Sequence, residues 1–415
     1  MSVLSPDFVV VGIGADGWRG LGEAVRDELR TATVIYGATR QLDLLSAVRG
    51  ELAADLRPWR SPMSAHLAEV IDEPRPHTVH VLASGDPMFH GVGASIVSRV
   101  GAERVRVYPA VSSVSLACAR LGWDLATTRV VSTVRNDPSE VLSEVTGGAR
   151  VVILSRDEAT PAAIARVLSQ SGFGASTMTV LEQLGGPDEQ IRRATADAWP
   201  HPPGDPLNIV AVECAGPGRT RLPGRADDTY EHDGQITKST IRALTVCALE
   251  PAGAQVLWDI GSGSGSVSIE WLRADDRGTA VAFERDPERA DRLIRNAGSH
   301  GVGSRLSVRG PAPQALSGAP RPDAVFIGGG LDDEILAGAW ESLRPAGRLV
   351  VNAVTVENQT LVARRHHERG GTMRRLSIET AAPLGTMTTW RPALPIVQWV
   401  VVKPDTTIED TGAAS

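Results

Sequence analysis

The chain has little cysteine, few aromatic residues and no excess of basic residues, and each shortage excludes a class of protein. Its 415 residues include three cysteines, Cys118, Cys214 and Cys247, which are far apart and lack Cys-x-x-Cys or Cys/His ligand spacing. We therefore expect no disulfide and no metal site, in a reduced, cytoplasmic protein. The net charge of −7 and an aromatic content of 4% argue against a general nucleic-acid binder, which needs a basic surface interleaved with aromatic residues.

Long hydrophobic runs are also missing. No apolar stretch approaches the roughly 18 residues that a membrane span requires. Residues 1–7 lack a basic region followed by an apolar stretch, so no signal peptide is expected. A hydrophobic content of 42% with 22% charged residues is typical of a soluble globular protein, and this length predicts two or three domains.

Short apolar runs alternate with segments of helical length, a pattern that predicts parallel α/β architecture throughout. In the first part of the chain, helices are expected over 22–30, 91–100, 113–121 and 161–169. Its predicted strands form two successive α/β units, over 8–13, 34–36, 80–83 and 105–108, then over 129–132, 151–154, 178–181 and 207–212.

Residues 215–229 carry Gly, Pro and Arg without an apolar pattern, and they separate predicted domains at 1–214 and 230–403. Residues 404–415 are expected to form a disordered tail. The last two strands predicted, Met387–Trp390 and Ile396–Val402, are expected to form a closing antiparallel hairpin. The other strands of this domain are predicted at 256–260, 280–283, 306–309, 324–327 and 348–353.

A glycine-rich turn gives the strongest functional signal. The apolar strand 256–260 leads directly into Gly261-Ser262-Gly263-Ser264-Gly265, and a helix is expected to begin at Ser266. Such a turn lets a nucleotide lie against bare backbone at a helix N-terminus, which also suits a carboxylate. The next strand ends at Glu284, whose carboxylate is placed to accept ribose hydroxyls. Adenosine together with an amino acid is S-adenosylmethionine, although another nucleotide or a plain tight turn remains open.

Three weaker motifs occur near the N-terminus. They are the loop 12–17 with Gly-x-Gly, the segment 83–89 with Ser84-Gly85-Asp86-Pro87, and the segment 109–113, which ends in Ser112-Ser113. Each also has a structural explanation, respectively a tight connection, a type I turn and a helix cap. For each motif considered alone, the structural explanation remains as open as ligand binding.

Taken together, these three motifs resemble the tetrapyrrole methylase family over about residues 8–214. The resemblance implies a fold of two α/β subdomains with the methyl donor folded between them. Ala15-Asp16 departs from the Pro-Gly that many relatives carry, which puts the substrate contact of the first loop in doubt. By this resemblance the donor would be lined by Ser84, Gly85, Asp86, Ser112 and Ser113, with Leu154 and Leu184 as later contacts.

The C-terminal motifs extend the resemblance. Residues 233–238 (Asp-Gly-Gln-Ile-Thr-Lys), 323–330 and 351–355 accompany the glycine turn. This set is similar to a Rossmann-like S-adenosylmethionine-dependent methyltransferase domain that decarboxylates precorrins. The fusion of both halves resembles the family of decarboxylating precorrin-6Y C5,15-methyltransferases. Its second donor site would comprise Thr237, Gly261, Ser262, Gly263, Ser264, Gly265, Glu284 and Ala312.

That family implies methylation of a reduced precorrin at C-5 by the N-terminal half. The C-terminal half would methylate C-15 and remove carbon dioxide from the C-12 acetate. The resemblance also suggests a homo-oligomer. Other readings are a methyltransferase acting on RNA or protein, which the acidic balance disfavours, and a donor-sensing protein with one inactive half.

Substrate-side candidates lie at the strand ends of the C-terminal half. Gly328 and Gly329 allow a flat substrate to approach the backbone, or form a flexible loop. Asn352 either bonds a substrate carboxylate or ties down a loop. Trp258 and Trp271 are expected in the core. The basic runs 364–367 and 374–375 are candidates for substrate carboxylates, but a solvated helix face explains such runs more often.

Overall fold

The computed structural model describes residues 6–74 and 77–405, and the chain divides after Gly218 into two compact units. Of the predicted disordered tail, residues 406–415 lie outside the described part. Among the described residues, no helix is both long enough and apolar enough to cross a membrane. The three cysteines form no disulfide.

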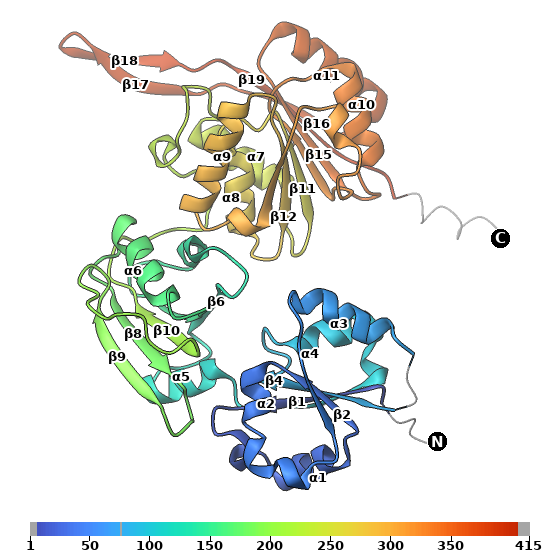
Figure 1. The fold of residues 1–415 in the computed structure, drawn as a ribbon. Coiled ribbons are helices and arrows are strands. Elements are labelled where there is room, and N and C mark those ends of the chain that lie inside the picture. Colours follow the sequence, from blue (N-terminus) through green and yellow to red (C-terminus); the bar gives the residue numbers. More distant parts are fainter. Residues whose placement is uncertain (1–5, 75–76, 406–415) are drawn as a thin grey trace, which may run out of the picture. The chain divides into compact units, whose positions relative to one another are not determined.

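The first unit opens with a parallel five-stranded sheet of order β3-β2-β4-β1-β5 (Figure 1). All six residues of β1 are buried, because helices cover both faces of the sheet. Val9 and Val11 pack on the side of α1, whereas Phe8 and Val10 pack on the side of α3 and α4. The elements are β1 (Phe8–Ile13), α1 (Glu23–Thr31), β2 (Val34–Gly37), α2 (Thr39–Asp43), β3 (Asp55–Pro58), α3 (Met63–Asp72), β4 (Val79–Ser84), α4 (Val92–Val100), β5 (Val105–Tyr108) and α5 (Ser113–Leu121).

The second sheet of this unit has the order β6-β7-β10-β8-β9. It is mostly antiparallel, so the prediction of parallel architecture throughout is wrong for this sheet. Only β6 and β7 pair in parallel, and the other three pairings are antiparallel. No helix lies between β8 and β9 or between β9 and β10, and without a crossover adjacent strands run antiparallel. The elements are β6 (Arg129–Ser132), β7 (Arg150–Leu154), α6 (Thr160–Gln170), β8 (Thr177–Glu182), β9 (Gln190–Thr195) and β10 (Asn208–Glu213).

The second unit is built on a seven-stranded sheet of order β13-β12-β11-β14-β15-β19-β16. The first five strands are parallel, which confirms the Rossmann-like prediction. Helices α7, α8 and α9 cover one face, and α10 and α11 cover the other (Figure 1). The bounds are α7 (Ser239–Leu249), β11 (Val256–Ile260), α8 (Ser266–Ala274), β12 (Thr279–Phe283), α9 (Pro287–Ser299), β13 (Leu306–Arg309), β14 (Ala324–Ile327), α10 (Asp333–Ser342), β15 (Arg348–Ala353) and α11 (Val356–Arg369).

The predicted closing hairpin of 387–390 with 396–402 is wrong. β19 (Ile396–Val402) lies between β15 and β16 (Thr372–Leu376), antiparallel to both. β18 (Met387–Pro392) pairs instead with β17 (Glu379–Leu384) in a separate two-stranded sheet. The reason is burial: the middle of β19 is buried in the core, whereas β18 is almost wholly exposed.

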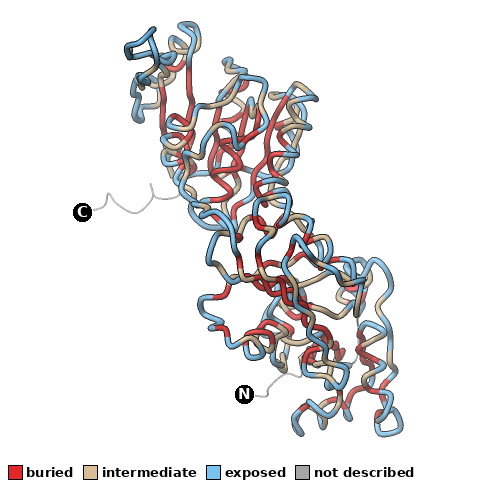
Figure 2. Tube along the Cα trace, turned by 90° about the vertical axis from the view of Figure 1, so that its left-hand side faces the viewer, coloured by how far each residue is buried: buried red, intermediate tan, exposed pale blue. Residues whose placement is uncertain are grey.

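The core follows the strands, where buried residues concentrate (Figure 2). Trp258 and Trp271 are 1% and 0% exposed, which confirms their predicted place in the core. The Trp258 indole donates a hydrogen bond to the carbonyl of Pro320 at 2.9 Å and packs edge-on against Phe283. These rings stabilise β11 and β12, the two strands that carry the glycine turn and Glu284.

Candidate functional site

In the first unit, the loops after β1, β4 and β5 meet at one edge of the sheet. A Cβ atom on Gly12 would lie 2.4 Å from the Gly85 carbonyl oxygen and 2.8 Å from the Ala110 Cβ. The Gly85 N–H donates to the Ile13 carbonyl at 3.0 Å, and Gly85 adopts φ +60°, which favours glycine. The structure therefore brings the three N-terminal motifs together at one edge of the sheet.

The polar side chains of this site have identifiable partners. Ser84 Oγ lies 2.8 Å from an Arg40 Nη atom and 2.9 Å from Gln41 Nε2. Both neighbours are donors, so the Ser84 hydroxyl proton remains available to a ligand. Asp86 accepts the backbone N–H of Met88 at 2.8 Å, the bond of a local turn. Ser112 caps α5 by accepting the Ser115 N–H at 3.1 Å, so the expected capping use is present.

The two leucines predicted as later donor contacts, Leu154 and Leu184, adjoin α5. Leu184 is buried in a cluster with Val114 and Ala117, and Leu154 packs against that cluster. Ser113 is the first residue of α5, and its backbone nitrogen lies 3.7 Å from where a Gly85 Cβ would stand. Helix α5 thus joins the second sheet to the three loops of the first.

In the second unit, the glycine turn has the backbone that its sequence requires. Gly261, Gly263 and Gly265 have φ of +70°, +55° and +73°. A Cβ on Gly261 would lie 2.5 Å from the Gly329 carbonyl oxygen, so the turn directly abuts the loop after β14. The Gly328 N–H donates to the Ile260 carbonyl at 3.1 Å. Two of the predicted glycine loops therefore meet at the carboxyl ends of β11 and β14, where ligands dock in open α/β sheets.

Glu284 follows β12 and lies beside this turn. Its carboxylate accepts the N–H of Gly263 at 2.8 Å and those of Arg285 and Asp286 at 3.0 Å each. The side chain is 7% exposed. Three backbone donors orient the carboxylate, and a carboxylate has capacity for a further donor such as a hydroxyl. Ala312, in the loop after β13, packs against the core cluster that contains Phe283.

Asp259 is a buried acidic residue near Glu284 that the sequence analysis did not single out as a candidate. It lies within β11, is 1% exposed, and accepts bonds from the backbone N–H and the hydroxyl of Ser268 on one oxygen. Its other oxygen has no hydrogen-bond partner within the described residues. Burial raises the pKa of Asp259 to about 6, and the nearby Glu284 carboxylate acts in the same direction. The available signal was an acidic residue in an apolar strand.

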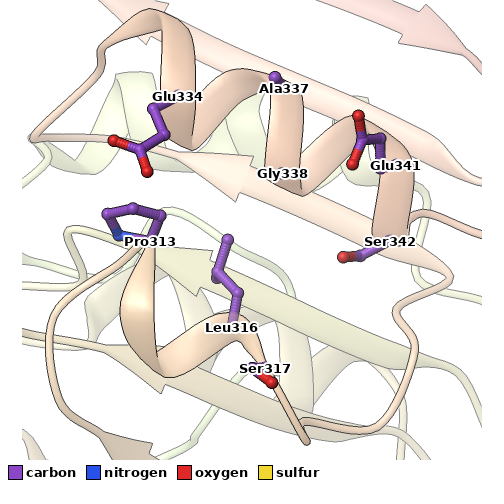
Figure 3. A pocket seen from close by; sticks show the side chains of 8 residues that line it. All are labelled: Pro313, Leu316, Ser317, Glu334, Ala337, Gly338, Glu341 and Ser342. Carbon is purple, nitrogen blue, oxygen red and sulfur yellow. The ribbon is translucent and has the colours of Figure 1, made fainter.

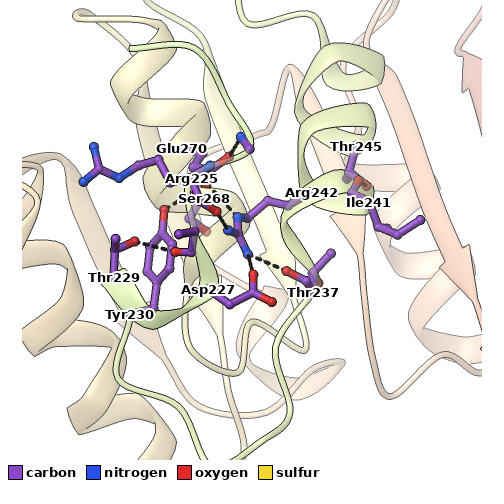
Figure 4. A network of polar contacts seen from close by, with 12 residues as sticks. Arg225, Asp227, Thr229, Tyr230, Thr237, Ile241, Arg242, Thr245, Ser268 and Glu270 are labelled. Atoms are coloured by element: carbon purple, nitrogen blue, oxygen red, sulfur yellow. Dashed lines mark hydrogen bonds and ion pairs between the residues drawn. The ribbon is translucent and has the colours of Figure 1, made fainter. Parts of the chain in front are cut away.

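Thr237 lies on a segment that a buried arginine holds in place (Figure 4). Arg242 is fully buried and donates to the Thr237 carbonyl at 2.5 Å, to Asp227 at 3.1 Å and to Glu270 at 2.6 Å. The Glu270 carboxylate also accepts the Tyr230 hydroxyl and the backbone N–H groups of Gly224 and Arg225. Residues 224–229, predicted as linker, are thereby bonded to α7 and α8 of the second unit.

Asn296 of α9 links the same segment to the glycine turn. Its amide nitrogen donates to the carbonyls of Glu231 and Ser264, both at 2.9 Å. Its amide oxygen accepts the Glu231 N–H at 2.8 Å. Asn296 is 2% exposed, so its polar atoms serve these internal contacts. Its role was not evident from sequence, because its partners lie 32 and 65 positions away.

Asn352, predicted on the substrate side, is mostly buried. Its amide nitrogen donates to Thr245 Oγ1 at 2.9 Å, and its oxygen accepts Gln398 Nε2 at 3.1 Å. These bonds join β15 to α7 and β19 and do not tie down a loop, which was the alternative left open beside substrate binding. Arg364 and Arg365 form ion pairs with Asp333, and Arg374 and Arg375 are exposed, in keeping with a solvated surface.

Two surface pockets lie outside these loops. A groove of about 350 Å³ separates α10 from the turn at 314–316 and is lined by Glu334 and Glu341 among others (Figure 3). A second, of about 410 Å³, lies beside the stacked rings of Tyr36 and Trp59. Neither contains a predicted site residue. Among the described residues, no group of three or more His, Cys, Asp or Glu is arranged to hold a metal ion.

The chain matches two family models. Residues 7–199 match the tetrapyrrole (corrin/porphyrin) methylases, and residues 228–403 match the precorrin methyltransferase domain. The first match covers the first sheet of the first unit and every strand of its second sheet except β10, and the second match covers the seven-stranded sheet.

Individual relatives match nearly the whole chain. A Sinorhizobium sp protein described as precorrin-6Y C(5,15)-methyltransferase [decarboxylating] is 42% identical over 96% of this chain and 97% of its own length. A Mycobacterium tuberculosis protein of the same description is 44% identical over 95% of this chain and 100% of its own. Among solved structures, the C-terminal domain of precorrin-6Y C5,15-methyltransferase from Rhodobacter capsulatus is 43% identical, with a TM-score of 0.43 over 45% of this chain and 100% of that one.

Proposed function

The chain belongs to the decarboxylating precorrin-6Y C(5,15)-methyltransferases, and on that premise we propose that it methylates a reduced precorrin twice, at C-5 and C-15, and decarboxylates its C-12 acetate. The methyl donor would be S-adenosylmethionine, and the pathway would be cobalamin biosynthesis. The observation that carries the proposal is the presence of one set of converging strand-end loops in each of two separate units.

The second unit fits an adenosine-bearing donor. Its three left-handed glycines leave bare backbone at the start of α8, and a side chain at Gly261 or Gly265 would collide with Gly329 or Leu293, respectively. Glu284 supplies an oriented carboxylate for ribose hydroxyls, and Asp259 supplies an unpartnered oxygen for a cationic amine. The proposed donor residues are Thr237, Gly261, Ser262, Gly263, Ser264, Gly265, Glu284 and Ala312, with Gly328, Gly329 and Asn352 on the substrate side.

The first unit fits a second donor molecule by its own chemistry. The Ser84 hydroxyl keeps a proton to donate, and the backbone at Gly85 lies against the loop that ends in Ser112 and Ser113. Asp86, Leu154 and Leu184 complete the proposed set. Here we assign C-5 methylation, and to the second unit C-15 methylation with decarboxylation.

When bound, S-adenosylmethionine supplies an electrophilic methyl group. The residues of each unit then need to hold the acceptor carbon in line with it and exclude water, and such alignment accounts for much of the rate enhancement in reactions of this kind. The buried Glu284 and Asp259 stay fixed by backbone and serine hydrogen bonds, so the site needs little reorganisation.

The direct test uses the purified chain, donor labelled in its methyl group, and the reduced macrocycle. We expect two methyl groups per macrocycle and one carbon dioxide. Asp86→Ala should reduce methylation at C-5, and Glu284→Ala should reduce C-15 methylation and gas release, as read by mass spectrometry. A Glu284→Ala protein that still forms the doubly methylated, decarboxylated product would refute the assignment of the second site.

We further propose that the chain forms a homo-oligomer through the β17–β18 hairpin. This hairpin extends from its unit (Figure 1) and exposes Leu384, Met387 and Trp390. Exposed apolar groups on a two-stranded sheet are stabilised by a partner surface. Met387→Asp with Trp390→Ser should lower the molar mass measured by light scattering, whereas Ile294→Ser, at an exposed site on α9, should leave it unchanged.

The cysteines bear on location. All three are free, and two of them are buried. Free thiols suit the reducing cytoplasm, where we propose the enzyme works. Fractionation of cells producing the chain, followed by detection with an antibody, would test this location.

A further inference from the structure

A partly buried guanidinium stands at the donor loops of the first unit without an acidic partner. Arg40 lies in the first turn of α2, just after β2, and donates to Ser84 Oγ at 2.8 Å. Within the described residues it forms no ion pair, whereas arginines elsewhere in this unit, such as Arg30 and Arg120, pair with carboxylates. Burial lowers the pKa of Arg40, as expected where water is partly excluded.

The acidic group that acts electrostatically on Arg40, Asp205, does not form an ion pair with it. Asp205 attracts the guanidinium electrostatically but lies beyond ion-pair distance. Its two oxygens accept Gln183 Nε2 at 2.9 Å and the Leu207 N–H at 2.7 Å. A guanidinium has five N–H donors, so the bond to Ser84 leaves enough of them for a bidentate carboxylate.

Apolar side chains are exposed on the same loops. Met88, Phe89 and Val111 are 45%, 39% and 61% exposed. Met88 and Phe89 follow Asp86 after the intervening Pro87, and Val111 directly precedes Ser112, so all three lie on the same two loops as the proposed donor residues. The two loops also touch, because a Gly85 Cβ would lie 3.5 Å from the Val111 carbonyl oxygen. His90, whose ring packs edge-on against Phe89, has φ +54°, a strained value of the kind that functional sites hold.

We propose that Arg40 binds a ligand carboxylate at the donor edge of the first unit, and that Met88, Phe89 and Val111 support the apolar face of the acceptor. This inference deepens the proposed function and rests on it. A flat macrocycle fringed with acids requires one cation and one apolar surface together, and these four residues supply both. The carboxylate belongs to the macrocycle or to the amino acid portion of the donor, and the two sources share this chemistry.

The test compares Arg40→Gln and Arg40→Lys in the full chain. If the carboxylate is the macrocycle's, Arg40→Gln raises the KM of C-5 methylation about 10- to 100-fold, the loss expected for a charge-assisted hydrogen bond. C-15 methylation and decarboxylation in the same sample stay unchanged and serve as an internal control. If the carboxylate is the donor's, calorimetry instead shows the same loss in affinity for S-adenosylhomocysteine at one of two sites. Arg40→Lys should recover part of either loss.

Arg49→Gln is the matched control. This arginine lies in the same unit but donates to the carbonyl of Ala54, at the amino end of β3 and away from the strand ends that carry the proposed site. Its loss should therefore change neither the KM of C-5 methylation nor the affinity for S-adenosylhomocysteine. If Arg40→Gln folds with the wild-type melting temperature and leaves KM and donor affinity unchanged, the proposal is overturned.

A failure of the proposed function would look different, because the wild-type chain itself would then transfer no methyl group to the precorrin. Binding of uroporphyrin, a stable acid-fringed macrocycle, is followed by fluorescence and still tests Arg40 in that case. Weaker binding by Arg40→Gln than by Arg49→Gln would support the inference, and equal binding together with unchanged donor affinity would refute it.

Discussion

At the scale of single residues, the buried Asp259 carboxylate lowers the stability of the fold but offers an unpartnered oxygen to a ligand. Its pKa is about 6 in the folded chain and 3.8 in an ordinary environment. The protonated form is therefore favoured in the folded state, and the stability it contributes is present below about pH 4 and lost as the pH rises through 6. At neutral pH Asp259 is mostly ionised and destabilises the second unit by roughly 3 kcal/mol.

Asp259→Asn should therefore stabilise the chain more at pH 7.5 than at pH 4.5. The amide keeps an acceptor for Ser268 but carries no charge. Urea unfolding of both proteins at the two pH values measures the difference, and donor calorimetry at pH 7.5 should show weaker binding by the variant. A stability difference that does not vary with pH would contradict the assigned cause.

Glu284 gives a second prediction at this scale. Glu284→Gln replaces one carboxylate oxygen with an amide nitrogen, which cannot accept the backbone N–H groups that point at it. We expect a loss of about 1–3 kcal/mol in stability and at least a tenfold loss of donor affinity at the second unit. Glu288→Gln, at an exposed position of α9, controls for the loss of charge and should change neither the stability of the chain nor the donor affinity.

Residue types and local spacing were enough to predict the glycine turn, Glu284 and the three N-terminal loops. They were not enough for Asp259, Arg242 or Asn296. The acidic residue in the apolar strand β11 was a signal for Asp259, but the sequence does not show that one of its oxygens lacks a partner. Asn296 acts through carbonyls that the fold brings to it from distant segments.

At the scale of elements, α9 fixes the position of the glycine turn. Asn296→Asp would place a carboxylate against the carbonyl oxygens of Ser264 and Glu231 in place of two donated hydrogen bonds. We expect destabilisation of about 2–4 kcal/mol, because unsatisfied buried groups are costly. Hydrogen exchange should become faster in 231–238 and in 261–265 together.

Asn358→Asp, on α11 of the same unit, is the control for that substitution. It is less buried, and it should leave exchange in both segments as in the wild-type chain. Faster exchange in only one of the two segments would show that Asn296 does not couple them.

Among the elements, strongly apolar strands were predictable and weakly apolar ones were not. β1 is recognisable in the sequence as a continuous apolar run, and β11 as an apolar run interrupted only by Asp259. β9 and β16 are mostly exposed edge strands, so no burial pattern marks them in the sequence. The pairing partner of β19 was missed because local periodicity does not say which strand lies across from it.

At the scale of the whole molecule, each unit contains its own core and its own set of converging loops. The clusters of the first unit include Val9 and Ile153, and those of the second include Trp258 and Trp271. Titration with S-adenosylhomocysteine should therefore show two sites per chain, and Glu284→Gln should remove one while leaving the other. Loss of both sites in that variant would mean that the donor sites are not independent.

The boundary of the second unit yields the last prediction. A fragment 219–415 retains Gly224, Arg225 and Asp227, which bond to the buried Glu270 and Arg242, whereas 230–415, cut where the sequence suggested, lacks them. Removing these partners leaves charged groups unsatisfied in the core, at a cost of about 3–5 kcal/mol. For a unit of this size the melting temperature should fall by roughly 6–20 °C. Calorimetric melting of the two fragments measures this difference. Equal melting temperatures would show that residues 219–229 contribute nothing to the stability of the fold. Glu270 and Thr237 alone would then satisfy Arg242.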